Sequence, residues 1–392
     1  MLDLKNALNL LKAQKKVMPI EEVPLTGCYG RILATDVFSD IDMPPFDKSA
    51  VDGYACRKED LLGELEIIGT AFAGEKTELK VEPGTCIKIM TGSPVPDGAD
   101  TVIMIEDTEL KGENKLHFTK TYSKTNICCR GEDVSHGDLV LKKGTLILPH
   151  HIGILASVGM TQIKVSGLPE IALIPTGSEL VEPDEKPKGA TIRNSNTYNL
   201  MAQLYRMGLQ SGYSGIIKDD PNLLSNNIRQ AIEKNDVVII TGGASVGEHD
   251  FIPEILDKEG MTIHFDKLSI QPGKPISFAS RNGKYCFGLS GNPVSSFLQF
   301  ELLVKPFLYH LMGHEYLYPL IKTTLTNRVT RKKSDRLKFF PVNVDGAMNA
   351  TEVQFNGSAH IAGLTNASGF GLFPLDRMKI NEGETLEVLL IN

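Results

Sequence analysis

The chain has 392 residues, which at about 150 residues per domain predicts two or three folding units, or four if some are small. Charged residues make up 23% of the chain and the apolar class, aromatic residues and cysteine included, makes up 41%. This balance excludes a disordered or fibrous protein and favours a globular one. The 41 basic and 48 acidic residues leave a net charge of −7, which argues against a nucleic-acid partner.

Membrane insertion and secretion are not expected from the sequence. No apolar run approaches the roughly 20 residues that span a bilayer. The first residues lack the basic and then apolar layout of a secretory signal, so we expect a cytoplasmic protein. The six cysteines are scattered and contain no C-x-x-C pair, and we interpret them as small, semi-buried hydrophobic side chains.

The first third of the chain predicts one helix followed by β-structure. Apolar residues recur at helical spacing over residues 1–17, which is typical of an amphipathic helix that packs on another unit. Signals over residues 19–42 are short and mixed, and the prolines of residues 43–47 predict a boundary. From residue 50 to about residue 138, short alternating runs between Gly, Pro and Asp turns predict a small β-domain or barrel.

Beyond residue 169, strands of about five residues alternate with helices of about ten or more. This pattern predicts a doubly wound, mostly parallel α/β sheet. The expected strands are 171–175, 214–217, 237–240, 274–278 and 285–289. The expected helices are 198–207, 223–233, one that ends at residue 255, and 293–311. After residue 319 the pattern returns to β, with runs at 322–329, 337–344 and 385–391, and predicts a separate C-terminal β-domain.

Two glycine-containing loops are candidates for binding an anion. In an open parallel sheet, ligands bind beyond the carboxyl ends of the strands. Residues 241–247 and 290–296 combine glycines with a following helix, whose free N–H groups attract negative charge. The alternative is that the glycines only serve tight turns. Neither loop matches the Walker A motif or the dinucleotide fingerprint.

Charged residues near the same strand ends suggest a metal site and an oxyanion site. Glu179, Asp219 or Asp220, and Asp250 follow three different strands, so the fold can gather them around a hard cation such as Mg²⁺. The alternative for each acid alone is a helix cap or a solvated loop residue. Lys267 and Lys274 can bind an oxyanion as point charges, and each alone can also be a solvated surface lysine.

Seven motifs together resemble the signature set of the molybdopterin molybdenumtransferases, a family that includes the E domain of gephyrin. The motifs run in family order and the resemblance covers the chain from about residue 1 to 392. In chain order they are 44–55 (PPFDKSAVDGYA), 90–96 (MTGSPVP), 130–133 (RGED), 175–180 (PTGSEL), 242–250 (GGASVGEHD), 272–275 (PGKP) and 288–295 (GLSGNPVS).

The resemblance implies a four-domain subunit and an elongated homodimer. The implied domains are a linking domain (20–42 and 138–168), a β-rich module (43–137), an α/β molybdopterin-binding domain (1–19 and 169–318) and a C-terminal β-domain (319–392). Each site is expected between the α/β domain of one subunit and the β-rich module of the other.

The reaction that the resemblance implies is insertion of molybdate into adenylylated molybdopterin, with Mg²⁺-dependent loss of AMP. A molybdopterin adenylyltransferase that hands over this intermediate is an expected partner. Two alternatives stay open, namely the preceding adenylyl transfer itself and a non-catalytic scaffold or carrier of the gephyrin E-domain type. Molybdate and tungstate have nearly the same size and charge, so the sequence does not separate them.

Site residues are carried over from the family motif by motif. Asp52 and Thr91 are expected on the β-module face of the site, and Glu179, Asp219 and Asp250 at the metal and the pyrophosphate. The expected substrate-binding residues are Gly242, Gly243, Ser245, Gly247, Lys267, Lys274, Pro275, Gly291, Asn292, Pro293, Ser295 and Arg336.

The chain departs from the family pattern at a few positions of the expected molybdate site. Gln271 stands where several relatives have a lysine, which removes one cation from the expected pocket. Ala362 and Gly363 stand where relatives often carry serines, so oxyanion contacts there are expected from the backbone.

Overall fold

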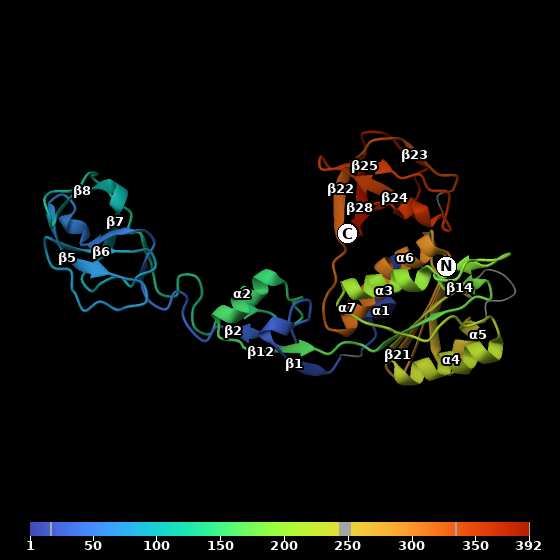
Figure 1. Ribbon diagram of the computed structural model, residues 1–392. Coiled ribbons are helices and arrows are strands. Elements are labelled where there is room, and N and C mark those ends of the chain that lie inside the picture. Colours follow the sequence, from blue (N-terminus) through green and yellow to red (C-terminus); the bar gives the residue numbers. More distant parts are fainter. Residues whose placement is uncertain (16–17, 243–251, 334, 392) are drawn as a thin grey trace.

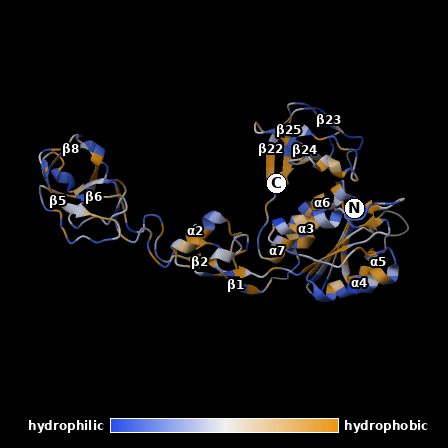
Figure 2. Cartoon of the chain, in the orientation of Figure 1, coloured by the Kyte–Doolittle hydropathy of each residue, from blue (hydrophilic) through white to orange (hydrophobic). Residues whose placement is uncertain are grey.

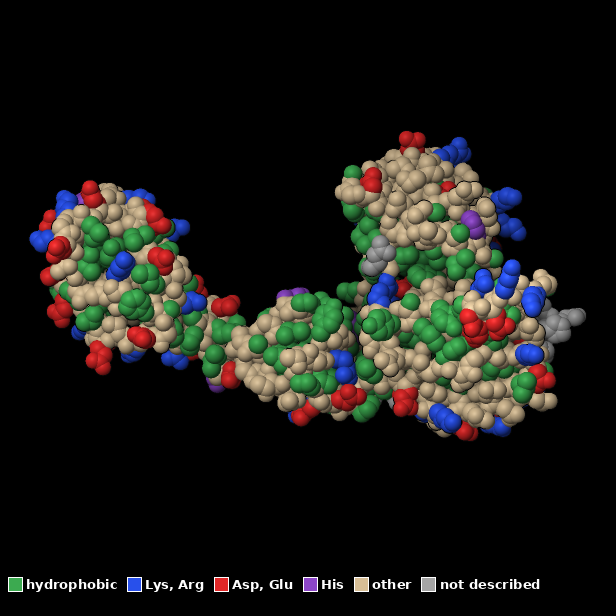
Figure 3. All heavy atoms as spheres, viewed as in Figure 1, with side chains coloured by type: hydrophobic (Ala, Val, Ile, Leu, Met, Phe, Trp, Pro, Cys, Tyr) green, Lys and Arg blue, Asp and Glu red, His purple; other side chains and the backbone are tan. Residues whose placement is uncertain are grey.

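The molecule is elongated, and its chain folds around several separate hydrophobic cores (Figures 1 and 3). The computed structural model describes residues 1–15, 18–242, 252–333 and 335–391. Four of the predicted site residues lie outside the described residues: Gly243, Ser245, Gly247 and Asp250. Within the described ranges, no helix is both long and apolar enough to cross a membrane.

A β-rich module occupies one end of the molecule (Figure 1). Its main sheet has the strand order β7-β4-β6-β5-β9-β8, and a short ladder joins β3 to β10. Two clusters of buried apolar side chains fill the module. The strands are β3 (Lys48–Ser49), β4 (Gly53–Cys56), β5 (Glu64–Ala71), β6 (Thr85–Ile89), β7 (Thr101–Met104), β8 (Thr108–Leu110), β9 (Lys115–Phe118) and β10 (Ile127–Cys128).

A small linking region connects this module to the rest of the chain. Two antiparallel ladders, β1 with β12 and β2 with β11, pack with one helix around their own apolar cluster. The elements are β1 (Ile20–Pro24), β2 (Val37–Phe38), β11 (Leu139–Leu141), α2 (Pro149–Ser157) and β12 (Gln162–Ser166). The exact boundaries of the four expected domains stay a prediction.

The α/β domain is built on a six-stranded sheet of order β16-β13-β17-β21-β20-β18. The four strands from β16 to β21 in this order run parallel, and β20 pairs antiparallel with both β21 and β18. The strands are β13 (Ile171–Pro175), β16 (Gly212–Tyr213), β17 (Val237–Thr241), β18 (Thr262–Lys267), β20 (Pro275–Arg281) and β21 (Lys284–Leu289), and a separate two-residue ladder joins β14 (Leu180–Val181) to β15 (Ile192–Arg193). The helices are α1 (Leu4–Lys12), α3 (Asn196–Arg206), α4 (Pro221–Lys234), α5 (Ile252–Lys258), α6 (Pro293–Gln299) and α7 (Lys305–Leu311).

Helices cover both faces of this sheet, which explains the continuous apolar runs of its central strands. Along each strand, successive side chains point to opposite faces. Leu173 and Ile239 join the core under α1, α3, α6 and α7, whereas Ile174 and Ile240 join the core under α4 and α5. Figure 2 shows the hydrophobic strands between helices whose outer faces are hydrophilic. The prediction of a doubly wound α/β domain is therefore confirmed.

Some predicted elements differ from the observed ones. The strand expected at 214–217 is wrong, because β16 comprises only the two preceding residues and Ile217 forms an isolated bridge with Thr176. The first helix is shorter than expected, since the Asp3 side chain caps its start and it ends at Lys12. The antiparallel strand β18 was not expected, and the helix expected to end at residue 255 continues to Lys258.

The expected helix 293–311 is a continuous helical segment with a π-helical stretch, Phe300–Val304, between α6 and α7. This stretch buries Glu301, which accepts hydrogen bonds from Arg206 and Lys305, both at 2.9 Å. Arg206 also donates to the Ile391 carbonyl at the end of the C-terminal domain. These contacts fix that domain on the α/β domain.

The C-terminal domain is a five-stranded barrel, closed by the pairing of β24 with β26. Phe340, Phe373 and other apolar side chains fill its interior. The short strand β19, which lies inside the α/β region of the sequence, adds to the barrel sheet beside β24. The strands are β19 (Ile270–Gln271), β22 (Leu320–Leu325), β23 (Val329–Thr330), β24 (Leu337–Val344), β25 (Asn349–Glu352), β26 (Gly369–Phe373), β27 (Lys379–Ile380) and β28 (Thr385–Leu390).

Candidate active site

Two cavities lie on either side of the loop between β21 and α6. The first, here called the glycine pocket, has a volume of about 360 Å³ and is lined by Gly242 and Gly291. The second, here called the lysine pocket, has a volume of about 330 Å³ and is lined by Lys274. Asn292 lines both cavities, so ligands in the two pockets would share one wall.

Three loops approach each other closely at the glycine pocket, because the residues at the closest points, Gly242 and Gly291, have no side chains. Gly242 has a φ of +91°, and a Cβ on it would lie 2.1 Å from the Thr176 carbonyl oxygen. A Cβ on Gly291 would lie 3.5 Å from the Cα of Gly242. The two loops predicted to cradle an anion are thus brought together at the carboxyl ends of β17 and β21.

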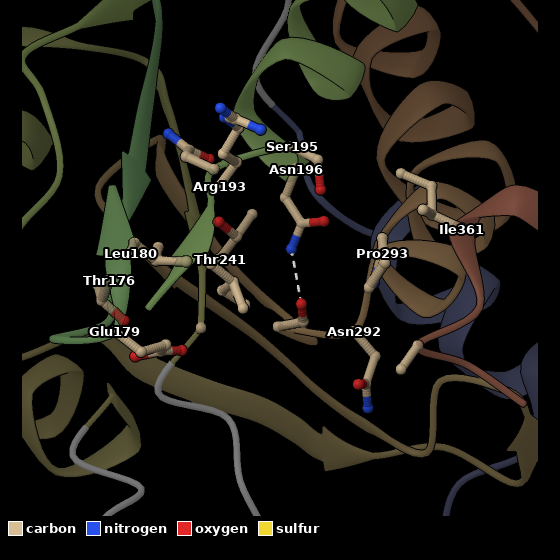
Figure 4. Close-up of a pocket in the computed structure, with 15 residues that line it drawn as sticks. Thr176, Glu179, Leu180, Arg193, Ser195, Asn196, Thr241, Asn292, Pro293 and Ile361 are labelled. Atoms are coloured by element: carbon tan, nitrogen blue, oxygen red, sulfur yellow. Dashed lines mark hydrogen bonds between the residues drawn. The ribbon is translucent and has the colours of Figure 1, made fainter. Parts of the chain in front are cut away.

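Polar atoms of the glycine pocket lack partners in the described part of the chain. Asn196, at the start of α3, donates from Nδ2 to the Gly291 carbonyl at 2.8 Å (Figure 4). Its Oδ1 atom and the Thr176 Oγ1 atom are buried, and neither has a hydrogen-bond partner among the described residues. Since buried polar groups are normally hydrogen-bonded, these atoms fit contacts to a bound polar ligand or water.

One predicted acidic residue lines this pocket, and a second one is hydrogen-bonded to the turn that carries it. Glu179 lines the pocket, and Figure 4 shows it beside Thr176, on the side opposite Ile361 of the C-terminal domain. Asp219 accepts a hydrogen bond from the Ser178 N–H at 3.0 Å, and its own N–H donates to Ser178 Oγ at 3.2 Å. A Cβ on Gly177 would lie 2.7 Å from Glu179 Oε2, so the Glu179 carboxylate lies directly against this turn.

Helix capping favours Asp219 over Asp220 as the site carboxylate. Asp220 is the N-cap of α4, and its Oδ1 accepts from the N–H groups of Asn222 at 2.9 Å and Leu223 at 2.8 Å. This leaves Asp219 as the carboxylate beside the turn that carries Glu179.

The acidic residues present fit part of a Mg²⁺ site. Glu179 and Asp219 are exposed and have no ion-pair partner among the described residues, and carboxylate oxygens are the ligands that Mg²⁺ prefers. Asp250, the third predicted ligand, lies outside the described residues. Within them, no group of three or more His, Cys, Asp or Glu side chains could hold a metal ion.

The lysine pocket lies between the α/β domain and the C-terminal barrel. Lys274 and Ser295 come from the α/β domain, and Arg336 and Lys338 come from β24 and the residues before it. No carboxylate side chain is among the described residues that line this pocket. The resulting positive potential suits a small, doubly charged anion.

A buried glutamine holds two loops of the lysine pocket in place. Gln299 in α6 has no exposed surface, and its Nε2 donates to the carbonyls of Gly273 at 2.9 Å and Pro275 at 2.8 Å. Its Oε1 accepts from the Ser290 N–H at 2.9 Å. Gln299 thereby positions both the loop of Lys274 and the loop shared with the glycine pocket.

The structure distributes the predicted site residues unevenly. Glu179, Gly242, Gly291, Asn292 and Pro293 line the glycine pocket. Lys274, Pro275, Asn292, Ser295 and Arg336 line the lysine pocket. Lys267 lies at the end of β18, exposed, with its Nζ 3.4 Å from Asp266, and lines neither cavity.

Asp52 and Thr91 belong to the β-rich module, at the other end of the molecule from both pockets (Figure 1). The Asp52 Oδ1 atom accepts from the Thr91 N–H at 2.7 Å and from its hydroxyl at 2.8 Å. These two bonds hold the pKa of the Asp52 carboxyl below its usual value. Within a single chain, the pair and the pockets are separate.

Sequence reasoning missed several polar residues of the pockets. Arg193 is an exposed cation of the glycine pocket, whose Nε donates to the Glu185 carbonyl at 3.1 Å, and Asn196 shares that pocket. Arg193 belongs to the two-residue strand β15 and Asn196 begins the helix after it, and so short a strand gives no periodic signal. Lys338 could have been found, because it lies in the predicted strand 337–344 and two residues after Arg336, which puts both on one side of an extended chain.

The fold defines a multidomain α/β protein with two neighbouring polar pockets, one beside glycine-containing loops and one lined by cations. Family models match three regions, the "MoeA N-terminal region (domain I and II)" at residues 2–159, the "Probable molybdopterin binding domain" at 172–310 and the "MoeA C-terminal region (domain IV)" at 323–391. The chain therefore belongs to the molybdopterin molybdenumtransferase family, as the sequence motifs predicted.

Relatives and solved structures agree with this assignment over the whole chain. A molybdopterin molybdenumtransferase of Staphylococcus aureus strain Mu50 is 36% identical over 98% of this chain and 94% of its own. One from Staphylococcus epidermidis strain RP62A is 33% identical over 99% and 95%. Two crystal structures of the molybdopterin biosynthesis protein MoeA from Pyrococcus horikoshii cover the whole chain and 99% and 100% of their own. Their identities are 33% and 29% and their TM-scores 0.79 and 0.86.

Proposed function

We propose that this protein inserts molybdate into adenylylated molybdopterin and releases AMP in a reaction that requires Mg²⁺. One observation carries the proposal: two cavities that differ in their charged side chains share the wall formed by Asn292. A pterin bound through its phosphates in one cavity would present its sulfur atoms to an oxyanion held in the other. Proximity of this kind is a major source of rate acceleration.

The glycine pocket is proposed to bind the pyrophosphate part of the adenylylated substrate. Backbone N–H groups in the loops at Gly242 and Gly291, together with the Arg193 guanidinium, would pair with phosphate oxygens. Mg²⁺ would be held by Glu179 and Asp219, with Asp250 as the third ligand. When bound, the ion would neutralise charge on the phosphoryl oxygens and so favour loss of AMP.

The lysine pocket is proposed to bind molybdate, the second substrate. Lys274 and Arg336 provide positive charge from two domains, and Ser295, which is buried, provides a hydroxyl. Closure of this pocket depends on the barrel, because Arg336 and Phe339 are part of its lining. Tungstate has the same charge and nearly the same size, so it serves as a second probe for the same site.

The functional unit is proposed to be a homodimer. The separation of Asp52 and Thr91 from both pockets within one chain supports this proposal, because a second subunit could bring the pair to the site (Figure 1). Mixing subunits that carry Asp52→Asn with subunits that carry Lys274→Met tests it. A mixed dimer would regain one intact site, and activity should return to about a quarter of the wild-type value when the subunits mix at random. No recovery in a verified mixed dimer would exclude a shared site.

The adenylylated substrate must come from an enzyme that transfers an adenylyl group to molybdopterin, and we propose such an adenylyltransferase as a partner. The cytoplasmic location stays a prediction.

The proposed reaction is tested by measuring AMP released from adenylylated molybdopterin, with molybdate and Mg²⁺ added separately and together. We expect release only when both are present. Adenylylation of molybdopterin by this chain and ATP would instead support the adenylyltransferase alternative. Tight binding of the intermediate with no release under any condition would support a carrier or scaffold.

A further inference from the structure

The side chains of Gln271 and Lys338 lie next to each other across two paired strands. The strands β19 and β24 run parallel, with Ile270 opposite Leu337 and Gln271 opposite Lys338. Residues opposite each other in a ladder point to the same face of the sheet. Ile270 and Leu337 pack into the α/β core, so Gln271 and Lys338 share the other face, and both line the lysine pocket.

The Lys338 ammonium is partly buried among apolar and charged groups. Its Nζ lies 5.7 Å from the ring centroids of both Phe340 and Phe373. Glu352 attracts it and Arg331 repels it, and burial is the main cause that lowers the pKa of Lys338. Burial likewise raises the pKa of Glu352.

Glu352 attracts the Lys338 ammonium, but no carboxylate of the described residues forms an ion pair with it within 4.0 Å. A partly buried cation without an ion-pair partner is costly, and a bound anion would offset that cost. Its two cross-strand neighbours cannot do so, because the Gln271 side chain is neutral and Phe373 is apolar. A bound anion on the β24 side of the pocket would therefore stabilise the Lys338 ammonium.

We propose that Lys338 binds the oxyanion of the lysine pocket together with Lys274 and Arg336, and so supplies from β24 the charge that its ladder partner Gln271 lacks. This inference rests on the proposed function, in which the oxyanion is molybdate. Two cations on the barrel side and one on the α/β side would then surround the anion, which makes its affinity depend on the contact between the two domains.

The experiment transfers the positive charge from position 338 to position 271, its partner in the ladder of β19 and β24. Binding of molybdate and of tungstate is measured by calorimetry for wild type, Lys338→Gln, Lys338→Arg and the exchange variant Gln271→Lys with Lys338→Gln. We expect about ten-fold weaker binding for Lys338→Gln and recovery to within about three-fold of wild type for the other two, since each restores a cation. Lys379→Gln is the matched control, because Lys379 is exposed on β27 of the same domain and does not line the pocket.

The outcomes separate this inference from the proposed function. Wild-type protein that releases AMP in response to molybdate, together with unchanged anion affinity in a folded Lys338→Gln variant, would overturn the role of Lys338 alone. Wild-type protein that neither binds molybdate nor releases AMP would overturn the proposed function as well. A thermal unfolding measurement shows whether Lys338→Gln is folded. If it is not, the anion affinities of the exchange variant and of Lys338→Arg test the role of Lys338. Weak binding by both, when folded, contradicts the proposal.

Discussion

The glycine pocket and the lysine pocket share Asn292 but differ in charge and in origin. The glycine pocket carries Glu179 on one side and Arg193 on another, and its frame is the set of loops after the parallel strands of one sheet. The lysine pocket carries three cations, with no carboxylate among its described lining residues, and needs both the α/β domain and the barrel. The difference indicates that the first suits a metal with phosphates and the second suits a bare oxyanion.

The largest expected effect is at the acidic side of the glycine pocket. Asp219→Ala should lower AMP release by a factor on the order of 100 to 1000, because the proposed metal ligand at the phosphates is lost. Asp220→Ala is the matched control, since this residue caps α4. It should cost about 1 kcal/mol of unfolding free energy and leave AMP release nearly unchanged. Equal activities of the two variants would refute the assignment of Asp219.

Removing a cation from the lysine pocket should come next in size. Lys274→Met keeps the aliphatic stem but removes the charge, and we expect molybdate to bind about 30- to 100-fold more weakly, with adenylylated molybdopterin bound as before. Lys267→Met provides the comparison, because Lys267 lines neither cavity and should change the affinity by less than about three-fold. A larger effect from Lys267 than from Lys274 would place the oxyanion elsewhere.

The loop shared by the two pockets can be loosened through its buried support. Gln299→Leu would leave the Ser290 N–H and the carbonyls of Gly273 and Pro275 without their partner. We expect a loss of about 3 kcal/mol of unfolding free energy and about a ten-fold higher KM for molybdate. Gln203→Leu, at another buried glutamine in contact with Glu301, should also destabilise the protein but leave that KM unchanged. Parallel changes in both variants would mean that Gln299 acts only on stability.

The smallest expected effect concerns the exposed pair on the β-rich module. Thr91→Val removes the hydroxyl bond to Asp52 but keeps the backbone bond, so the pKa of Asp52 should rise part of the way toward its usual value. A lowered carboxyl pKa stabilises the fold at neutral pH. The variant should therefore have a smaller free energy of unfolding than wild type at neutral pH, and this difference should vanish as the pH falls through the lowered pKa. An NMR titration of the carboxyl measures this shift, and an unchanged pKa would contradict the role of the hydroxyl.

The sequence predicted a strand well where its own residues form a clear pattern of apolar side chains, and poorly where they do not. Strands 171–175 and 285–289 were predicted well, because strands buried on both faces read as continuous apolar runs. The two-residue strand β16 and the half-exposed strand β18 carry too little periodicity, which is why the former was misplaced and the latter missed.

The residues of the two pockets also differed in how well the sequence predicted them. Gly242 and Gly291 were found from their loops alone, since both follow buried strands that end at one edge of the sheet. The place of Lys338 in the lysine pocket depends on the pairing of Gln271 with a strand 67 positions further along the chain, and no local pattern fixes that register. The roles proposed for the two pockets therefore rest on the structure and not on a local sequence pattern.

The most direct test of this division is the position of tungsten in crystals soaked with tungstate, located by its anomalous scattering. We predict one strong peak in the lysine pocket, within contact distance of Lys274 and Arg336, and none in the glycine pocket. A peak in the glycine pocket, or none in either cavity at saturating tungstate, would contradict the account.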